Sequence, residues 1–384
     1  MQDYDKPLLK NGEPLKLLEC ASHHCIRCVK KGRAFKKLGY EVHGMGNRIS
    51  YGVNDYNTYV VWQNERQFKS SIKAYIDIGV NAITWNNEPD LPAIWIRQVI
   101  TDMNKQDDVK LVSDLHDLDS VRRKLIPLEE RKMINISDGL IYVSLPIEKE
   151  TNELHKIIIP TTTIYSYCNE GIIEYDEDKI GERSAIVYEG GANPPEDTEL
   201  NKVFSYRSLY DIMRKLVAMG NEVHMFCGNV TAVEPYSTIG VVCYPPALYD
   251  EMMKGMLKFK YGVLVFNNHD GKKDQVNLTL TNKMHEYLQC GIPSLACWCP
   301  ESEKYVKKHN IGFTFNHIDE IGDCSQLNDH YIDVMNNIKT KRKELVMENF
   351  ISRVENLYAE VHGIEGKSVP KRIQKLQDLE YKGE

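Results

Sequence analysis

The chain has 384 residues, of which 42% are hydrophobic and 27% are charged, and its formal net charge is −7. This length predicts two globular domains of about 150–200 residues each, and the acidic balance argues against nonspecific nucleic-acid binding. No stretch approaches the roughly 20 apolar residues of a membrane span, and the acidic N-terminus lacks the apolar core of a secretory signal, so we expect a cytoplasmic protein.

The first half of the chain alternates predicted strands and helices. Runs rich in β-formers predict strands over residues 15–20, 81–85, 109–114 and 138–144, and a turn leads into another strand over residues 39–46. Helical patterns lie between them, over residues 26–38 and 92–103. Strands separated by helices imply a parallel sheet with helices on both faces.

The alternation stops at an acidic, turn-rich segment over residues 169–182 and then restarts. Strands are predicted over residues 185–189, 222–227, 240–244 and 261–266, with helices over 206–219 and 247–258. The sequence therefore predicts an α/β protein of two doubly wound, Rossmann-like domains. We place them at residues 1–165 and 166–345, followed by a terminal segment over 346–384.

The most specific motif runs from Asn282 to Pro293, Asn-Lys-Met-His-Glu-Tyr-Leu-Gln-Cys-Gly-Ile-Pro. It predicts a short amphipathic helix that is stopped by Gly291. Lys283 and Glu286 lie three residues apart and therefore share one helix face. This pattern resembles the donor-site helix of GT-B glycosyltransferases of the retaining, family-four-like group, in which the lysine binds phosphate and the glutamate binds ribose hydroxyls.

The resemblance implies further donor ligands in the second domain. Gly190 and Gly191 end a predicted strand, where glycine lets the backbone approach a phosphate closely. Arg207 is the basic residue expected to contact the diphosphate, and Asn282 opens the donor helix. The chain departs from the family at Leu278, where many members carry a second glutamate, and this leaves the sugar-binding half of the donor site open.

In the first domain, candidate site residues follow two predicted strands. His116, in the segment Asp-Leu-His-Asp-Leu, matches a histidine that faces the donor sugar across the cleft in similar enzymes, and Asp117 is its expected orienting partner. Glu88 lies in a loop that resembles an acceptor-contacting loop of the family. For His116 a helix-capping role, and for Glu88 a place near a helix N-terminus, are the structural alternatives.

The implied reaction transfers a sugar, expected to be a hexose, from a UDP- or GDP-sugar to the hydroxyl of a glycan, lipid-linked or other acceptor. The resemblance implies two domains that face each other across a cleft, a terminal helix over residues 345–362 that returns to the first domain, and retention of anomeric configuration. Two alternatives stay open, a nucleotide-sugar epimerase on the same scaffold and a catalytically inactive nucleotide-sugar-binding protein.

Ten cysteines and two Asp-x-Asp tripeptides raise the question of metals and disulfides. The cysteines lack the regular four-ligand spacing of a zinc site, and most lie beside apolar runs, so we expect free thiols. Cys25-x-x-Cys28 also matches a redox pair. The tripeptides at 117–119 and 176–178 match the metal motif of GT-A enzymes. We expect metal independence and no tightly bound cofactor.

A cluster of basic residues lies on the predicted helix over residues 26–38, formed by Lys30, Lys31, Arg33, Lys36 and Lys37. A solvated helix face is one interpretation of this pattern. Contact between the Lys30–Lys37 segment and an anionic acceptor or a membrane surface is the other.

Overall fold

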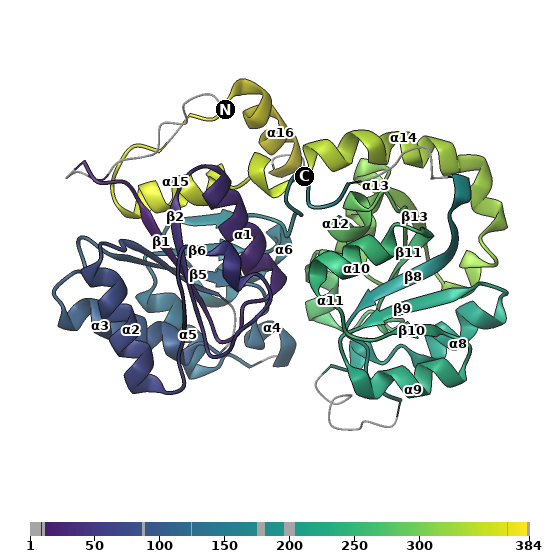
Figure 1. Cartoon of the computed structure of the whole chain (residues 1–384), viewed down its shortest axis with the longest axis horizontal. Helices are drawn as coiled ribbons and strands as arrows, with labels where there is room; N and C mark the ends of the chain where they lie inside the picture. The colour runs from purple at the N-terminus through teal and green to yellow at the C-terminus, as the bar shows by residue number, and fades with distance from the viewer. Residues whose placement is uncertain are drawn as a thin grey trace. The chain divides into compact units, whose positions relative to one another are not determined.

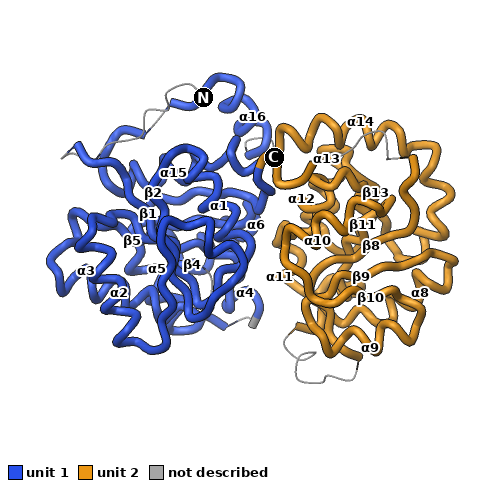
Figure 2. Tube along the Cα trace, in the orientation of Figure 1, with its two compact units in different colours: residues 1–169, 346–384 blue, residues 170–345 orange. Residues whose placement is uncertain are grey.

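The computed structural model describes residues 9, 12–86, 89–123, 125–174, 181–195, 204–366 and 368–381. The chain forms two compact units, one of residues 1–169 and 346–384 and the other of residues 170–345 (Figure 2). Each unit has its own parallel β-sheet, and the expectation of two doubly wound α/β domains is confirmed.

Unit 1 contains a seven-stranded sheet in the order β3-β2-β1-β4-β5-β6-β7, with every neighbouring pair parallel (Figure 1). Its strands are β1 (Lys16–Ala21), β2 (Glu41–Gly46), β3 (Tyr59–Val61), β4 (Ala82–Asn86), β5 (Lys110–Leu115), β6 (Gly139–Tyr142) and β7 (Thr161–Thr163). Its helices are α1 (Ile26–Lys37), α2 (Glu65–Asp77), α3 (Leu91–Asp102), α4 (Asp119–Arg123), α5 (Leu128–Ile136), α6 (Leu145–His155), α15 (Ser352–Val361) and α16 (Lys371–Tyr381).

Adjacent residues of β4 show which helices cover each face of this sheet. The side chains of Thr84 and Trp85 point to opposite faces, because side chains alternate along a strand. The Thr84 hydroxyl lies 2.5 Å from the hydroxyl of Tyr358 on α15, and Tyr358 contacts Phe35 of α1. The Trp85 ring instead contacts Phe68 of α2. Helices α1 and α15 therefore cover one face, and α2 lies on the other.

Unit 2 contains a six-stranded sheet in the order β10-β9-β8-β11-β12-β13, again with parallel pairs throughout. Its strands are β8 (Ser184–Gly190), β9 (Val223–Cys227), β10 (Val242–Tyr244), β11 (Phe259–Val265), β12 (Ser294–Cys297) and β13 (Gly312–Phe315). Its helices are α8 (Tyr210–Ala218), α9 (Val230–Thr238), α10 (Tyr249–Met256), α11 (Asp274–Leu278), α12 (Asn282–Gln289), α13 (Pro300–His309) and α14 (Asn328–Glu344).

Two predicted helix boundaries were wrong. The helix expected over residues 345–362 begins only at Ser352, because Val346 forms a β-bridge with Cys168 and the next residues form a short 3₁₀ helix. The helix expected over residues 206–219 begins as a separate 3₁₀ turn, Ser205–Arg207, before α8 starts at Tyr210. In both places a local 3₁₀ turn precedes the helix proper.

Candidate functional site

The strand order of unit 2 defines one position for a ligand. From β8 the chain builds the sheet outward in one direction through β9 and β10, and in the other through β11, β12 and β13. The direction of winding therefore reverses between β8 and β11. In open parallel sheets, ligands bind beyond the carboxyl ends of the strands at such a reversal point.

Gly190, the last residue of β8, lies at this reversal point against the Lys283 side chain. A Cβ atom at Gly190 would lie 2.8 Å from Lys283 Cε and 3.0 Å from Nζ, and the φ angle of Gly190 is +120°. Both observations favour glycine here, since a side chain would strain the backbone and displace the end of the lysine. A Cβ atom at Gly191 would similarly lie 3.2 Å from Arg207 Nη1. The structure thus brings together four of the predicted donor ligands.

The two cations at this glycine pair rest on aromatic rings. Lys283 Nζ lies 4.9 Å from the centre of the Phe266 ring and 5.2 Å from that of Tyr188. The Arg207 guanidinium lies 5.2 Å from the centre of the Phe204 ring. These contacts hold both cations by cation–π attraction.

Lys283 is held in place by the packing of α12 on the sheet. A Cβ atom at Gly262 of β11 would lie 2.5 Å from Tyr287 Cδ2, so the absence of a side chain lets the helix approach the strand closely. The Tyr287 hydroxyl accepts a hydrogen bond from Glu189 N at 3.1 Å and donates to Val263 O at 3.1 Å. Gly291, with a φ angle of +64°, ends the helix as the motif predicts.

Glu286 and Asn282 lie on the same short helix as Lys283. Glu286 is 2% exposed, whereas Asn282, the first residue of α12, is half-buried. Burial lowers the pKa of the Lys283 ammonium, while the carboxylates of Glu189 and Glu286 act in the opposite direction and Arg207 adds to the lowering. A cation whose charge is disfavoured by burial and by a neighbouring cation gains most when an anion arrives.

A second cluster of charged side chains lies in unit 1, at the carboxyl ends of β1, β4 and β5. Lys31 of α1 lies 2.5 Å from Asp114 Oδ2 and 3.3 Å from Glu19 Oε2, and it donates a hydrogen bond to Asn86 Oδ1 at 2.8 Å. Arg27 donates to both carboxylate oxygens of Asp114. All five side chains are buried. The reversal of winding in unit 1 lies between β1 and β4, so this cluster occupies the ligand-binding position of its sheet.

His116 belongs to this second cluster. Its Nε2 atom lies 3.3 Å from Asp114 Oδ2, and its Nδ1 atom lies 3.6 Å from the sulfur of Cys25. Burial by itself would lower the pKa of His116, but Asp114 and Cys25 outweigh it and raise this pKa to about 9. The imidazole is therefore protonated at neutral pH, and it can donate hydrogen bonds but cannot serve as a base.

Asp117, the expected orienting partner, lies beside Arg122. Its Oδ2 atom lies 3.5 Å from Arg122, and Asp119 Oδ1 lies 3.5 Å from the same guanidinium. The carboxylate beside His116 is Asp114, which sequence reasoning missed although it stands two residues earlier in the same segment. Glu88 and the tripeptide at 176–178 lie outside the described residues.

The interpretation of a solvated basic face on α1 was wrong for two of the five cations on which it rested. Lys30 is 1% exposed and Lys31 is fully buried. Lys30 donates to Ser166 O, and Arg33 pairs with Asp55 at 2.9 Å. Lys31 can be buried with the apolar residues of this helix because the carboxylates of Glu19 on β1 and Asp114 on β5 compensate its charge.

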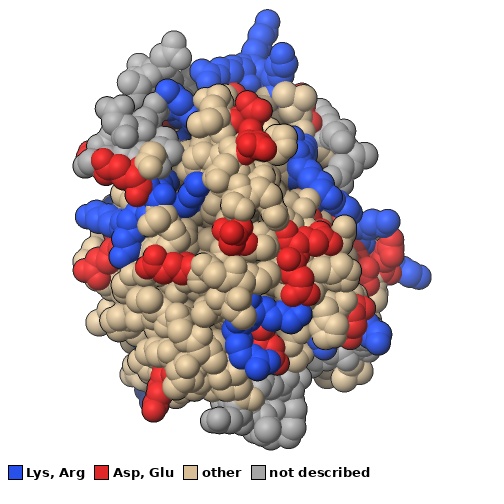
Figure 3. Space-filling view, turned by 90° about the vertical axis from the view of Figure 1, so that its right-hand side faces the viewer, with Lys and Arg blue, Asp and Glu red and all other residues tan. Residues whose placement is uncertain are grey.

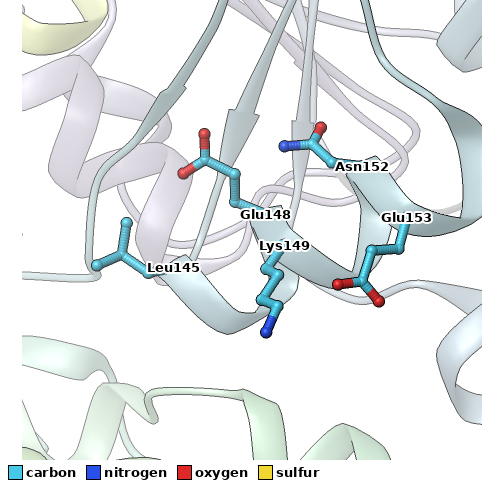
Figure 4. Close-up of a pocket in the computed structure, with 5 residues that line it drawn as sticks. All are labelled: Leu145, Glu148, Lys149, Asn152 and Glu153. Atoms are coloured by element: carbon cyan, nitrogen blue, oxygen red, sulfur yellow. The ribbon is translucent and has the colours of Figure 1, made fainter. Parts of the chain in front are cut away.

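A hollow of about 430 Å³ elsewhere in unit 1 is lined by Leu145, Glu148, Lys149, Asn152 and Glu153, all from α6 (Figure 4). The Glu148 carboxylate there accepts hydrogen bonds from the hydroxyls of Thr161 and Thr163 on β7. The Glu148 side chain thus links α6 to β7 by hydrogen bonds. None of the predicted site residues lines the hollow.

No protein-family model matches the sequence, and a comparison with curated proteins finds no match. Solved structures do match. Sucrose-phosphate synthase from Thermosynechococcus elongatus aligns with a TM-score of 0.64 at 12% identity, over 91% of this chain and 99% of its own. WaaG, a glycosyltransferase involved in lipopolysaccharide biosynthesis, aligns with a TM-score of 0.55 at 8% identity, over 90% and 100%.

The chain has the GT-B fold. A UDP-N-acetylglucosamine 2-epimerase also aligns, with a TM-score of 0.54 at 9% identity over 92% of this chain and 99% of its own. At these identities the GT-B likeness shows the architecture alone. The residues described above must therefore carry any argument about chemistry.

Among the described residues, no group of three or more His, Cys, Asp or Glu side chains could hold a metal ion. No helix in this part of the chain is long and apolar enough to cross a membrane. On the face shown in Figure 3, acidic and basic side chains are interspersed. That face lacks the broad basic surface that binds a nucleic-acid backbone.

Proposed function

We propose that the protein is a glycosyltransferase that moves a sugar from a nucleoside diphosphate sugar to an acceptor hydroxyl. One observation carries the proposal: Lys283 and Arg207 lie against the Gly190-Gly191 backbone at the winding reversal of the second sheet. Two cations beside a half-buried stretch of glycine backbone suit a diphosphate, since phosphate is recognised by cationic side chains and by backbone N–H groups.

The charges at this position explain how transfer would be accelerated. As the bond between the sugar and the diphosphate breaks, negative charge builds up on the leaving diphosphate. Lys283 and Arg207 would stabilise that charge, and their aromatic supports fix them before the reaction begins. Glu286 would accept hydrogen bonds from the ribose hydroxyls, and Asn282 would bind beside it. In this proposal the two cations stabilise the leaving diphosphate without a metal ion.

The residues of unit 1 are assigned to the sugar and the acceptor. In this proposal the protonated His116 donates a hydrogen bond to the transferred sugar, Asp117 belongs with it to the catalytic site, and Glu88 acts toward the acceptor. The finer assignments are a UDP- or GDP-linked hexose as donor, retention of configuration, a glycan or lipid-linked acceptor and a cytoplasmic location. They rest on the resemblance of the Asn282–Pro293 motif to the donor-site helix of GT-B glycosyltransferases. The ten free thiols agree with a reducing compartment.

Thermal unfolding with UDP, GDP and their common sugar conjugates tests the donor assignment. A ligand present at 100 times its dissociation constant stabilises the folded state by about 2.7 kcal/mol. For a unit of 176 residues (170–345), this predicts a rise in melting temperature of about 5–10 °C. At least one nucleotide should produce this rise, and Lys283→Met at the same ligand concentration should reduce it by at least about half, because a 10-fold loss of affinity lowers the stabilisation to about 1.4 kcal/mol. No rise with any of them would overturn the proposal.

A nucleotide-sugar epimerase is the second candidate, because a UDP-N-acetylglucosamine 2-epimerase shares the fold. An epimerase converts its substrate without an acceptor, whereas a transferase needs one. Incubation with labelled nucleotide-sugar alone, followed by chromatography of the sugar, separates the two. A new epimer would favour the epimerase. An unchanged sugar that is transferred once glycan acceptors are supplied would favour the transferase. Nucleotide binding without either product would indicate the inactive binding protein that Leu278 leaves open.

A further inference from the structure

A pair of thiols lies at the start of α1, beside the buried charge cluster of unit 1. Cys25 immediately precedes the first residue of the helix, and Cys28 lies in its first turn. Their sulfur atoms are 3.6 Å apart, and both are free thiols. Cys25 is half-buried, whereas Cys28 is buried. A disulfide needs a separation of about 2.0 Å, so the two sulfurs would close by roughly 1.6 Å.

The surroundings of Cys25 favour its thiolate form. The His116 imidazolium lies 3.6 Å from the sulfur and is itself paired with Asp114. The N-terminus of α1 adds a partial positive charge. A hydrogen bond from Cys28 and the charge of His116 lower the pKa of Cys25, while burial raises that of Cys28. The other titratable groups that act on the two thiols are Lys31, Glu19, His24, Tyr56 and Tyr59.

The charges of the cluster lead to the same conclusion. Arg27, Lys31 and protonated His116 carry three positive charges, and Glu19 and Asp114 carry two negative charges. A thiolate at Cys25 brings the negative charges to three. Removing charges from water is costly unless they are compensated, so this buried group favours the ionised sulfur.

We propose that Cys25 and Cys28 form a reactive dithiol that is oxidised by low-molecular-weight disulfides, with Cys25 as the attacking thiolate and Cys28 as the resolving thiol. In the first step a new bond joins Cys25 Sγ to one sulfur of the small disulfide, whose S–S bond breaks and releases one thiolate. In the second, deprotonated Cys28 attacks Cys25 Sγ, which forms the protein disulfide and releases the second thiolate. The two thiol protons pass to the leaving thiolates, so two electrons leave the protein and reduce the small disulfide to two thiols.

The site is independent of the proposed transferase activity, because its reactivity is read from the thiols themselves. The chain also supplies an internal control. Cys243 is likewise half-buried, but it lies in unit 2 and burial raises its pKa. Faster reaction of Cys25 than of Cys243 would therefore point to thiolate character, because neither thiol is fully exposed.

The first experiment labels the full-length protein with iodoacetamide at pH 6.5 and quantifies the modified peptides by mass spectrometry. A low thiol pKa raises the thiolate fraction more than it lowers the nucleophilicity. Cys25 should therefore react at least about tenfold faster than Cys243, and His116→Gln should reduce this ratio toward one. Equal rates in the wild-type protein would overturn the proposal.

The second experiment treats the protein with oxidised glutathione and digests it with trypsin without reduction. Cleavage after Arg27 separates the two cysteines, so their disulfide appears as a crosslinked peptide pair. The wild-type protein should give this pair, and Cys28→Ser should instead stop at a glutathione adduct on Cys25. Absence of both products would overturn the proposal. So would stoichiometric zinc in the isolated protein that is lost in Cys25→Ser and Cys28→Ser, because the thiols would then be metal ligands.

Discussion

Substituting Gly190 by alanine is the most direct test of the proposed phosphate site. The new Cβ atom would lie 2.8 Å from Lys283 Cε, whereas carbon atoms in contact are normally about 3.5–4.0 Å apart. The end of the lysine must therefore move by roughly 0.7–1.2 Å. Such a shift costs little stability, because the side chain is flexible, but it moves the ammonium from the position in which we expect it to bind phosphate.

The backbone strain of this substitution can be measured separately. Gly190 and Gly220 both have positive φ angles, +120° and +92°, but a Cβ atom at Gly220 would meet nothing within 4 Å. Each alanine variant should lose about 1–2 kcal/mol of stability, which corresponds to about 2–8 °C in melting temperature. Only Gly190→Ala should also lose nucleotide affinity. A charge-assisted hydrogen bond contributes about 1.5–3 kcal/mol, so the expected loss is about 10- to 100-fold.

Isothermal titration with whichever of UDP and GDP stabilises the protein more strongly would measure this loss. If the alanine acts by displacing the lysine, the double variant Gly190→Ala/Lys283→Met should bind no more weakly than Lys283→Met alone. Wild-type affinity in Gly190→Ala despite a lower melting temperature would refute the reasoning. Fully additive losses in the double variant would do so as well.

Three further predictions follow from the same contacts. Lys283→Met should weaken UDP or GDP binding by about 10- to 100-fold, whereas Lys260→Met, which removes a lysine over other rings of the same unit, should leave titrated affinity unchanged. Lys31→Met leaves two buried carboxylates without this cation and should lower the free energy of unfolding, measured in urea, by about 3–5 kcal/mol. The control Lys105→Met removes an exposed ion pair and should lower the free energy of unfolding by less than about 1 kcal/mol. His116 should titrate near pH 9 in an NMR titration. Because its pKa is raised in the folded protein, its contribution to stability is complete below about pH 6.5 and is lost as the pH rises through about 9. Titration near pH 6.5 would contradict the ion pair with Asp114.

The sequence alone predicted much of the fold, and it indicated the residues of the candidate donor site that lie close together in the chain. The strands came from short runs of β-forming residues between helical patterns, and their order along the chain was enough to indicate two parallel sheets. Lys283, Glu286 and Gly291 were found because they lie within one short helix and its exit. Within a single helix, spacing fixes which side chains share a face, so no tertiary information is needed.

Tertiary structure decided the chemistry of unit 1. The spacing of Lys30 and Lys31 indicated a solvated surface, and only the folded sheet brings Glu19 and Asp114 to meet a buried cation there. These carboxylates come from β1 and β5, which are nearly a hundred residues apart in the chain. In the sheet only β4 lies between these two strands. The contact between Cys25 and His116 spans a similar separation. Local patterns can tell which face of a helix is apolar, but whether a charge can be buried depends on a partner whose position only the completed sheet determines.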